Sequence, residues 1–397
     1  MNILIVTEVF YPENFHVNDF AQSLVERGYN VKVMTRQPSY PVGYVFSGYK
    51  NERHSVEQWG KVEIHRFDII EGYKESKIKK IANYYHYVKI GKQIISEIID
   101  DVDLIIVYQT GPLSLALPAI YAKKKFNVPV IVWSFDIWPD TVYMYGFPHI
   151  APVSTLVNYI IKKVYRNADA IMVSSKLFAD TIHHYAPEAE ITYAPNWLIQ
   201  TECKPTSLSF DTSKTNFVFT GNISKAQNLE NTVRGFIHAQ LDNAVLNIVG
   251  DGTYLPTIKD IVDKSGNKNI VLHGRVPYNE IPDILEKCDF LVLPLTPKSG
   301  VDKTEPFKIQ SYLQSQKPIL GIIRGAGKDI IESNNLGTCC DPEDITDISR
   351  GFLRMLCLSD IEKLSISSAA QSLMESRFCK EKIIQTIETL MRNVCKC

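Results

Sequence analysis

Short apolar runs rich in β-branched residues alternate with helical patterns along the first half of the chain. The runs predict buried strands, and the periodic segment 18–27, closed by Gly28, predicts the first helix. The predicted strands are Asn2–Thr7, Val31–Thr35, Val62–Phe67, Leu104–Tyr108, Val130–Trp133, Ala170–Ser174 and Ile191–Tyr193. Strands joined by crossover helices form parallel sheets buried on both faces, so this half predicts a Rossmann-like α/β domain.

The same alternation begins again after a polar stretch at residues 200–214. Its predicted strands are Asn216–Thr220, Val245–Val249, Ile270–His273, Asp289–Pro294 and Pro318–Ile323, each followed by a helical pattern. We therefore expect two Rossmann-like domains facing across a cleft, the first covering residues 1–200 and the second residues 201–379.

Composition excludes several classes of protein. The chain has 397 residues and a net charge of −1, which gives no basic surplus for nucleic acid. Its eight cysteines contain no C-x-x-C pair, which argues against a zinc site and a disulfide framework and favours a cytoplasmic protein. The uncharged window 104–122 is broken by Gly111, Pro112 and Pro118, so strand, loop and helix are expected there rather than a membrane span.

The sequence supports neither a dinucleotide-binding G-x-G-x-x-G motif nor a metal-binding Asp-x-Asp motif. No G-x-G-x-x-G follows any predicted strand, which weakens a dehydrogenase interpretation. Asp101-Val102-Asp103 resembles a metal-binding Asp-x-Asp, but it stands at the amino end of its strand, away from the ligand-binding edge. We interpret it as a solvated turn.

The stretch from Pro294 to Leu320 is the clearest candidate for a binding site. A helix is expected to begin near Thr304 as N-cap, with Pro306 in its first turn, and to stop before Pro318. Lys308, Ser311 and Tyr312 then share one helical face. A helix N-terminus with a lysine in its first turn favours an anion such as phosphate; the alternative is a solvated surface helix.

Glycine-containing loops follow the other strands of the second domain. Gly221 permits close backbone approach, and Asn222 and Lys225 offer donors to phosphate oxygens. Gly250-Asp251-Gly252 and Gly274-Arg275-Val276 follow the next two strands. Because the carboxyl ends of parallel strands meet at one edge of a sheet, these loops and the Lys308 helix predict a site for a nucleoside diphosphate.

In the first domain, aromatic and acidic residues follow the strands. One loop runs from Glu8 to His16, another from Gln109 to Pro112, and a third from Ser134 to Asp140. Asp136 between aromatic residues suits a sugar, because a carboxylate accepts hydroxyl hydrogen bonds while rings cover the apolar ring face. The alternatives are a turn or N-cap role for Asp136 and a backbone-satisfied loop histidine for His16.

At these residues the sequence resembles the retaining glycosyltransferase family four, with the GT-B fold. More narrowly, it is similar to the bacterial surface-polysaccharide branch that includes N-acetylfucosaminyltransferases. The motifs that carry the resemblance are Pro41-Val42-Gly43-Tyr44, Gly48-Tyr49-Lys50, Asp136-Ile137-Trp138-Pro139-Asp140, Pro195-Asn196-Trp197, Gly221–Gln227, Gly250-Asp251-Gly252 and Pro306–Pro318.

The resemblance implies an acceptor-binding first domain, a second domain that binds a nucleotide sugar, no obligatory metal or other cofactor, and retention of anomeric configuration. It also implies that a C-terminal helix at about 380–397 crosses back onto the first domain. The residues implied in catalysis are Lys308, Asp136 and His16. Those implied in donor binding are Gly221, Asn222, Ser224, Lys225, Gly250, Gly252, Arg275, Val276, Glu305, Phe307, Ser311 and Tyr312, and those in acceptor binding are Tyr11, Asn14, Tyr40 and Trp138.

The chain departs from the family pattern at several of these positions. Two glutamates eight positions apart are replaced by Lys303 and Ser311, and Glu305 is displaced by two residues. Asn222 stands where an arginine is often found, and Phe135 where a histidine is often seen.

The resulting prediction is transfer of a sugar from a nucleotide donor, UDP-linked, to a hydroxyl of a growing lipid-linked glycan such as O-antigen or capsule. Lysines 74, 77, 79, 80, 89 and 92 are interleaved with tyrosines and accompanied by one acid, Glu75, which suits an anionic inner-membrane face. A solvated surface helix is the alternative there. Two other functions remain open: a GT-B nucleotide-sugar 2-epimerase, and a non-catalytic partner subunit.

Overall fold

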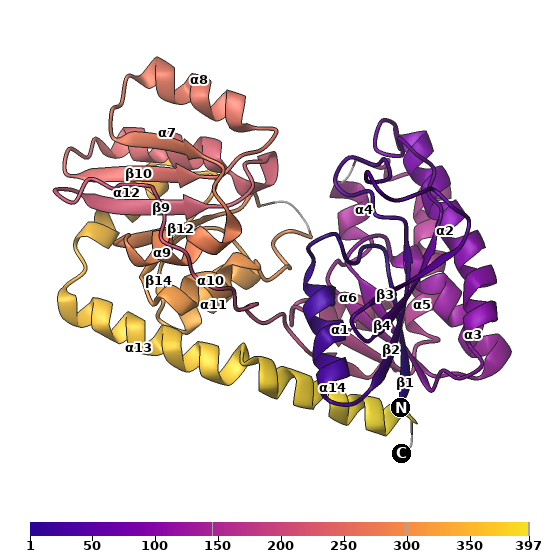
Figure 1. Cartoon of the computed structure of the whole chain (residues 1–397). Coiled ribbons are helices and arrows are strands. Elements are labelled where there is room, and N and C mark those ends of the chain that lie inside the picture. Colours follow the sequence, from indigo (N-terminus) through magenta and orange to yellow (C-terminus); the bar gives the residue numbers. More distant parts are fainter. Residues whose placement is uncertain (145, 298–299, 396–397) are drawn as a thin grey trace. The chain divides into compact units, whose positions relative to one another are not determined.

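The computed structural model describes residues 1–144, 146–297 and 300–395 (Figure 1). The chain forms two compact units. The N-terminal unit comprises Met1–Pro195 and Ile384–Cys397, and the C-terminal unit comprises Asn196–Ile383. The division at Pro195 lies a few residues before the boundary expected at 200, and the last segment returns to the N-terminal unit.

The N-terminal unit is built on an eight-stranded sheet in the order β3-β4-β2-β1-β5-β6-β7-β8. The strands are β1 Asn2–Thr7, β2 Asn30–Arg36, β3 Ser55–Trp59, β4 Val62–Phe67, β5 Leu104–Gln109, β6 Val130–Ser134, β7 Ala170–Val173 and β8 Ile191–Tyr193. All neighbours pair in parallel except β3, which pairs antiparallel with β4 at the edge. The pattern of apolar runs missed β3 because its polar residues give no continuous apolar run.

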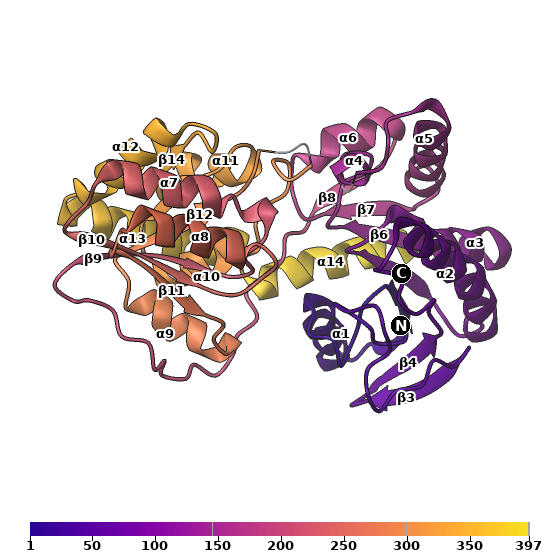
Figure 2. The same cartoon turned by 90° about the horizontal axis from the view of Figure 1, so that it is seen from above.

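Helices cover this sheet on both sides (Figure 2). They are α1 His16–Glu26, α2 Lys77–Ile98, α3 Leu117–Phe126, α4 Asp140–Met144, α5 Ala151–Tyr165, α6 Phe178–Tyr185 and α14 Lys380–Cys395, with a 3-10 turn η1 at Leu113–Ala116. One core packs α2, α3, α5 and α6 against the sheet, with Ile94, Ala119, Ile161 and Ile182 as contributors. The hydroxyl of Tyr29 donates to Glu388 of α14 at 3.0 Å, which joins the last helix to this unit.

The C-terminal unit contains a six-stranded parallel sheet in the order β11-β10-β9-β12-β13-β14. The strands are β9 Thr215–Thr220, β10 Ala244–Val249, β11 Ile270–Gly274, β12 Phe290–Pro294, β13 Ile319–Ile322 and β14 Gly337–Cys340. The edge strand β14 is short and lacks β-branched aliphatic residues, so the sequence pattern did not predict it.

Each face of this second sheet has its own core. On one face α7 Leu229–Ala239, α8 Leu255–Ser265 and α12 Ile345–Leu356 bury Phe236, Ile258 and Phe352. On the other, α9 Ile281–Glu286, α10 Lys308–Ser315, α11 Ala326–Ser333 and α13 Asp360–Arg377 enclose a second apolar cluster. Two 3-10 turns, η2 Lys225–Gln227 and η3 Tyr278–Glu280, follow β9 and β11. The parallel order brings the loops after β9, β10, β11 and β12 to one edge.

Candidate functional site

The loops after the central strands of the C-terminal unit lie side by side. Thr220 pairs with Val249, which in turn pairs with Gly274. Beyond these pairs, the amide of Gly221 donates to Val249 at 2.9 Å, and the amide of Gly250 donates to Gly274 at 2.8 Å. The loops after β9, β10 and β11 therefore start at neighbouring positions along the same edge of the sheet.

The glycines in these loops are required by contacts between the loops. A Cβ at Gly250 would lie 1.8 Å from the carbonyl oxygen of Gly221, and one at Gly252 would lie 2.3 Å from the carbonyl oxygen of Ile223. Gly221 and Gly250 also have φ values of 135° and 151°, which strongly favour glycine. The glycines thus build the loop edge itself, and close approach of a ligand stays a prediction.

Lys308 lies against the Gly221 loop. Its Nζ donates to the side-chain oxygen of Gln227 and stands 4.0 Å from the centroid of the Phe219 ring. A Cβ at Gly221 would meet its Cε at 2.7 Å. Burial of this amine lowers its pKa to about 7. A bound anion would supply the counter-charge that the amine needs to stay protonated.

The helix that carries Lys308 begins later than expected. Lys308 is its first residue and Phe307 its N-cap, without a side-chain cap. Thr304 is not the N-cap: its hydroxyl donates to the carbonyl of Gly300 at 2.8 Å. The physical reason is Pro306, which disfavours helical backbone at Glu305 and so keeps the preceding residues out of the helix. The end of α10 at Ser315, before Pro318, agrees with the prediction.

Two residues expected to contact the donor are used inside the protein. Tyr312 is completely buried, and its hydroxyl donates to the carbonyl of Val292 at 3.1 Å, so it belongs to the core. Glu305 is only 6% exposed, and its carboxylate is paired with Arg377 at 2.6 Å. Both donor-contact expectations are corrected. Helical spacing, which suggested Tyr312, does not reveal which face is covered, and the resemblance, which suggested Glu305, does not reveal its pairing with Arg377.

The remaining donor-site candidates differ in exposure. Asn222, Lys225, Arg275 and Phe307 are exposed, whereas Gly252, Ser224, Val276 and Ser311 are partly buried. The hydroxyl of Ser311 donates to the carbonyl of Lys308 at 2.9 Å, which places it one turn along from the lysine. The amide of Thr296 donates to the carbonyl of Ala226 at 2.9 Å, tying the segment after β12 to the Gly221 loop.

In the N-terminal unit, the carboxyl ends of β1, β5 and β6 bring two carboxyl groups to one edge. Thr7 pairs with Tyr108, which pairs with Trp133, so the residues that follow them are neighbours. Glu8 forms an ion pair with the buried Arg36 at 2.6 Å. A Cβ at Gly111 would lie 2.2 Å from its Oε2, so a larger residue there would displace this carboxylate from its present position.

Asp136 follows β6 at this edge. Its burial, and then the negative charge of Glu8, raise the pKa of Asp136 to about 7. Phe135 directly precedes Asp136, and its ring centroid lies 4.4 Å from that of Tyr108 on the neighbouring strand. His16 opens α1, with its Nδ1 3.4 Å from the hydroxyl of Tyr108, so this histidine has a side-chain neighbour from the same edge. Sequence reasoning missed Glu8, although its place directly after the first strand was an available signal.

The loops after β1 and β2 are held together by a second buried carboxylate, Glu13. It accepts hydrogen bonds from the amides of Ser39 at 2.8 Å and Tyr40 at 2.6 Å. Tyr40 is 44% exposed, with the Nζ of Lys74 4.2 Å from its ring centroid.

The other acceptor candidates divide into surface and core positions. Tyr11 is partly exposed and stacks on Trp59, with centroids 5.1 Å apart. Asn14 is exposed, whereas Trp138 packs against the core. Of these positions, Tyr11, Asn14 and Tyr40 are therefore exposed, and Trp138 is partly buried.

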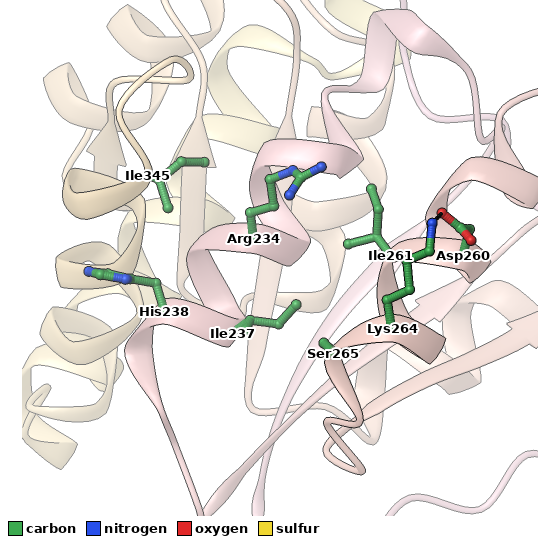
Figure 3. Close-up of a pocket in the computed structure, with 8 residues that line it drawn as sticks. All are labelled: Arg234, Ile237, His238, Asp260, Ile261, Lys264, Ser265 and Ile345. Atoms are coloured by element: carbon green, nitrogen blue, oxygen red, sulfur yellow. Dashed lines mark hydrogen bonds and ion pairs between the residues drawn. The ribbon is translucent and has the colours of Figure 1, made fainter.

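A cavity of about 550 Å³ lies outside these edges (Figure 3). It is lined by Arg234, Ile237, His238, Asp260, Ile261, Lys264, Ser265 and Ile345. These residues come largely from the second halves of α7 and α8, which run toward the amino ends of the strands. Lys264 is paired with Asp260 at 2.7 Å. The cavity is therefore distinct from the loop edge that carries Lys308.

Within 1–144, 146–297 and 300–395, no group of three or more histidine, cysteine or acidic residues is arranged to hold a metal ion. Across the same ranges, no helix is both long enough and apolar enough to cross a membrane.

Comparison with known families matches both halves of the chain. Residues 14–197 match the glycosyl transferase 4-like domain, and residues 201–371 match glycosyl transferases group 1. A probable glycosyltransferase of Pseudomonas aeruginosa, WbjE, is 20% identical over 267 residues, which are 64% of this chain and 66% of that protein. An uncharacterized glycosyltransferase of Methanocaldococcus jannaschii, MJ1178, is 24% identical over 119 residues, which are 29% of this chain and 32% of that protein. The chain thus matches less than two thirds of the length of either relative.

Solved structures establish the architecture. A sucrose-phosphate synthase from Thermosynechococcus elongatus superposes with a TM-score of 0.74 at 14% identity, covering 99% of this chain and 98% of that one. HepE from Anabaena, solved in complex with UDP, gives a TM-score of 0.69 at 13% identity, covering 99% and 100%. At such identities the likeness concerns the fold alone, and that fold is GT-B.

Proposed function

Because the chain carries a glycosyltransferase 4-like domain followed by a group 1 glycosyltransferase domain, we propose that it transfers a sugar from a nucleoside-diphosphate donor to a hydroxyl of a glycan. The donor binds the C-terminal unit and the acceptor binds the N-terminal unit. Transfer proceeds with retention of configuration and without an obligatory metal.

The observation that carries the proposal is the contact between Lys308 and the Gly221 loop. The amine is held beside Gly221, Gln227 and the Phe219 ring at the carboxyl edge of a parallel sheet, in surroundings that disfavour its charge. A diphosphate at this position would accept hydrogen bonds from the amine and restore its charge. Negative charge grows on the diphosphate as the sugar leaves, so the same contacts would stabilise the transition state more than the ground state.

We assign acceptor binding to the edge formed by Glu8, Asp136 and His16. Glu8 is paired with the buried Arg36, whereas Asp136 takes up a proton near neutral pH. Such a pair offers one acceptor and one donor to neighbouring hydroxyl groups of a sugar. The departing diphosphate then takes the proton of the attacking hydroxyl on the same face, so the protein supplies orientation and charge stabilisation.

For the base and the sugar, we propose a UDP-linked hexose or N-acetylhexosamine. The similarity to HepE, whose structure contains UDP, supports the choice of uridine. Resemblance to surface-polysaccharide enzymes supports a bacterial O-antigen or capsule glycan as acceptor, carried on a lipid at the cytoplasmic face of the inner membrane.

The first turns of α2 offer a surface for that membrane face. Ile78, Ile81 and Tyr85 are exposed at spacings that place them on one side of the helix. Lysines 77, 79, 80, 89 and 92 lie along the same helix. An exposed apolar stripe among lysines suits shallow insertion into an anionic leaflet.

A panel of nucleotide sugars tests the proposal. The purified protein would be incubated with each donor and a lipid-diphosphate-linked sugar acceptor, and released nucleoside diphosphate and extended glycan would be measured together. We expect both products from one donor, in equal amounts. Conversion of UDP-N-acetylglucosamine alone to its C2 epimer would identify an epimerase instead, and failure to bind any donor would favour a non-catalytic subunit.

A further inference from the structure

The helix that carries Lys308 is tied to the two segments where the chain passes between its compact units. Glu305, just before α10, pairs with Arg377, the last residue of α13 and close to Ile383, where the C-terminal unit ends. On α10 itself, the side-chain amide of Gln310 donates to the carbonyl of Asn196, the first residue of this unit, at 3.4 Å. Both contacts lie within the C-terminal unit.

The side chains that make these contacts are buried. Glu305 and Gln310 are 6% and 3% exposed, and the Arg377 side chain is largely covered. Removing one partner of a buried ion pair leaves the other charge without compensation, so the pair strongly favours one geometry. Pro306 follows Glu305 directly, and its fixed φ restricts the backbone between Glu305 and the start of the helix.

The opposite end of α10 has an anchor of its own. The hydroxyl of Ser367 on α13 donates to the side-chain oxygen of Gln316 at 2.7 Å. Loss of the Glu305 contact would therefore loosen the segment that leads into α10 and Lys308, while the end of the helix stays attached.

We propose that Glu305, Arg377 and Gln310 are positioning residues that hold Lys308 against the Gly221 loop and connect an anion bound there to both crossing segments. This inference rests on the proposed function, because the anion is the diphosphate of the donor. Binding of the diphosphate immobilises Lys308, and through these ties it also orders the crossing segments near residues 194–198 and 374–383.

Calorimetry with UDP and with uridine tests the positioning role. Glu305→Gln and Arg377→Met are expected to weaken UDP binding by about tenfold and to leave uridine binding unchanged, because only the phosphate contact depends on Lys308. Their double variant should be no weaker than either single variant. Asp341→Asn, which breaks the exposed pair of Asp341 with Arg324 in the same unit, is the control and should bind UDP like the unaltered protein.

Hydrogen exchange tests the connection to the crossing segments. In the unaltered protein, UDP should slow hydrogen exchange at residues 194–198 and 374–383. Glu305→Gln should abolish this slowing at 374–383. Gln310→Leu should abolish it at 194–198. A merely structural role would lower uridine and UDP affinity alike. Unchanged UDP binding in both ion-pair variants would overturn this inference alone, whereas an unaltered protein that binds no nucleoside diphosphate would overturn the proposed function as well.

Discussion

Burial moves the pKa of Lys308 down and the pKa of Asp136 up, in both cases to about 7. Each group sits at the carboxyl edge of a parallel sheet, where open α/β proteins bind their ligands. Perturbed titration at such an edge is a recognised sign of a functional position, although structural ion pairs also produce it. The two side chains therefore allow tests that do not depend on knowing the substrate.

Binding of UDP should be accompanied by proton uptake at alkaline pH. At pH 8 the free amine of Lys308 is mostly neutral, because its pKa is about 7. A diphosphate beside it raises this pKa, so close to one proton should enter the complex. Calorimetry in buffers of different ionisation enthalpy measures the uptake. It should be unchanged in Lys259→Met, an exposed lysine on α8, and a complex that takes up no proton at pH 8 would contradict the assignment.

Replacing Asp136 with asparagine should stabilise the protein above neutral pH. The folded-state pKa of Asp136 is raised, so the native state holds its proton more tightly than the unfolded chain, and stability falls as pH rises from about 4 to about 7. Asp136→Asn removes this loss. We expect the variant to match the unaltered protein near pH 4 and to exceed it by up to about 4 kcal/mol at pH 8.

Denaturant unfolding at both pH values checks this expectation. The exposed Asp100→Asn serves as the control and should show no such difference. A variant that gains nothing at pH 8 would show that the Asp136 carboxyl is ionised without cost in the native state.

Among the structural elements, the loops after β9 and β10 depend on glycine for their mutual packing. Gly250→Ala would place a methyl group 1.8 Å from the carbonyl oxygen of Gly221. The backbone must shift, at a cost of about 2 kcal/mol or more. Gly266→Ala is the matched control, because Gly266 also has a positive φ but open space around it, and should cost about 1 kcal/mol. Equal effects on thermal unfolding would refute the packing role.

The exposed stripe on α2 predicts a second effect at the scale of an element. Replacing Ile78, Ile81 and Tyr85 with asparagine should weaken binding to phosphatidylglycerol vesicles by at least about tenfold, since each buried apolar side chain contributes roughly 1 kcal/mol or more at the interface. Ile361→Asn on α13 is the control, because Ile361 and Ile78 are both 80% exposed. Co-sedimentation measures the binding. If the stripe variant sediments like the control, α2 is simply a solvated helix.

The elements also show why sequence predicted most, but not all, of the architecture. Apolar runs mark buried parallel strands, and these were found in both halves. The edge strands β3 and β14 carry too few apolar residues to give that signal. Tyr312 was assigned to the donor because helical spacing shows which side chains share a face, but not that the face is covered. Glu305 was assigned from the family resemblance, which does not show its ion pair. Arg377, the partner of Glu305, is distant in sequence, so no local pattern could reveal the pair.

At the scale of the whole molecule, each compact unit has its own sheet and its own apolar core. Two successive strand-helix series separated by a polar stretch were sufficient to predict this division. The exact crossing points at Pro195 and Ile383 could not be predicted, because they depend on which unit covers the connecting residues. The assignment of the donor to the C-terminal unit rests on the contact between Lys308 and the Gly221 loop.

The most direct test of this assignment compares Lys308→Met with the unaltered protein. Calorimetry would measure the affinity of each protein for UDP and for uridine. A lysine that contacts the diphosphate contributes a charged hydrogen bond, so UDP binding should fall by about 10- to 100-fold while uridine binding is preserved. Equal UDP affinity in the two proteins would contradict the claim that Lys308 and the Gly221 loop hold the diphosphate.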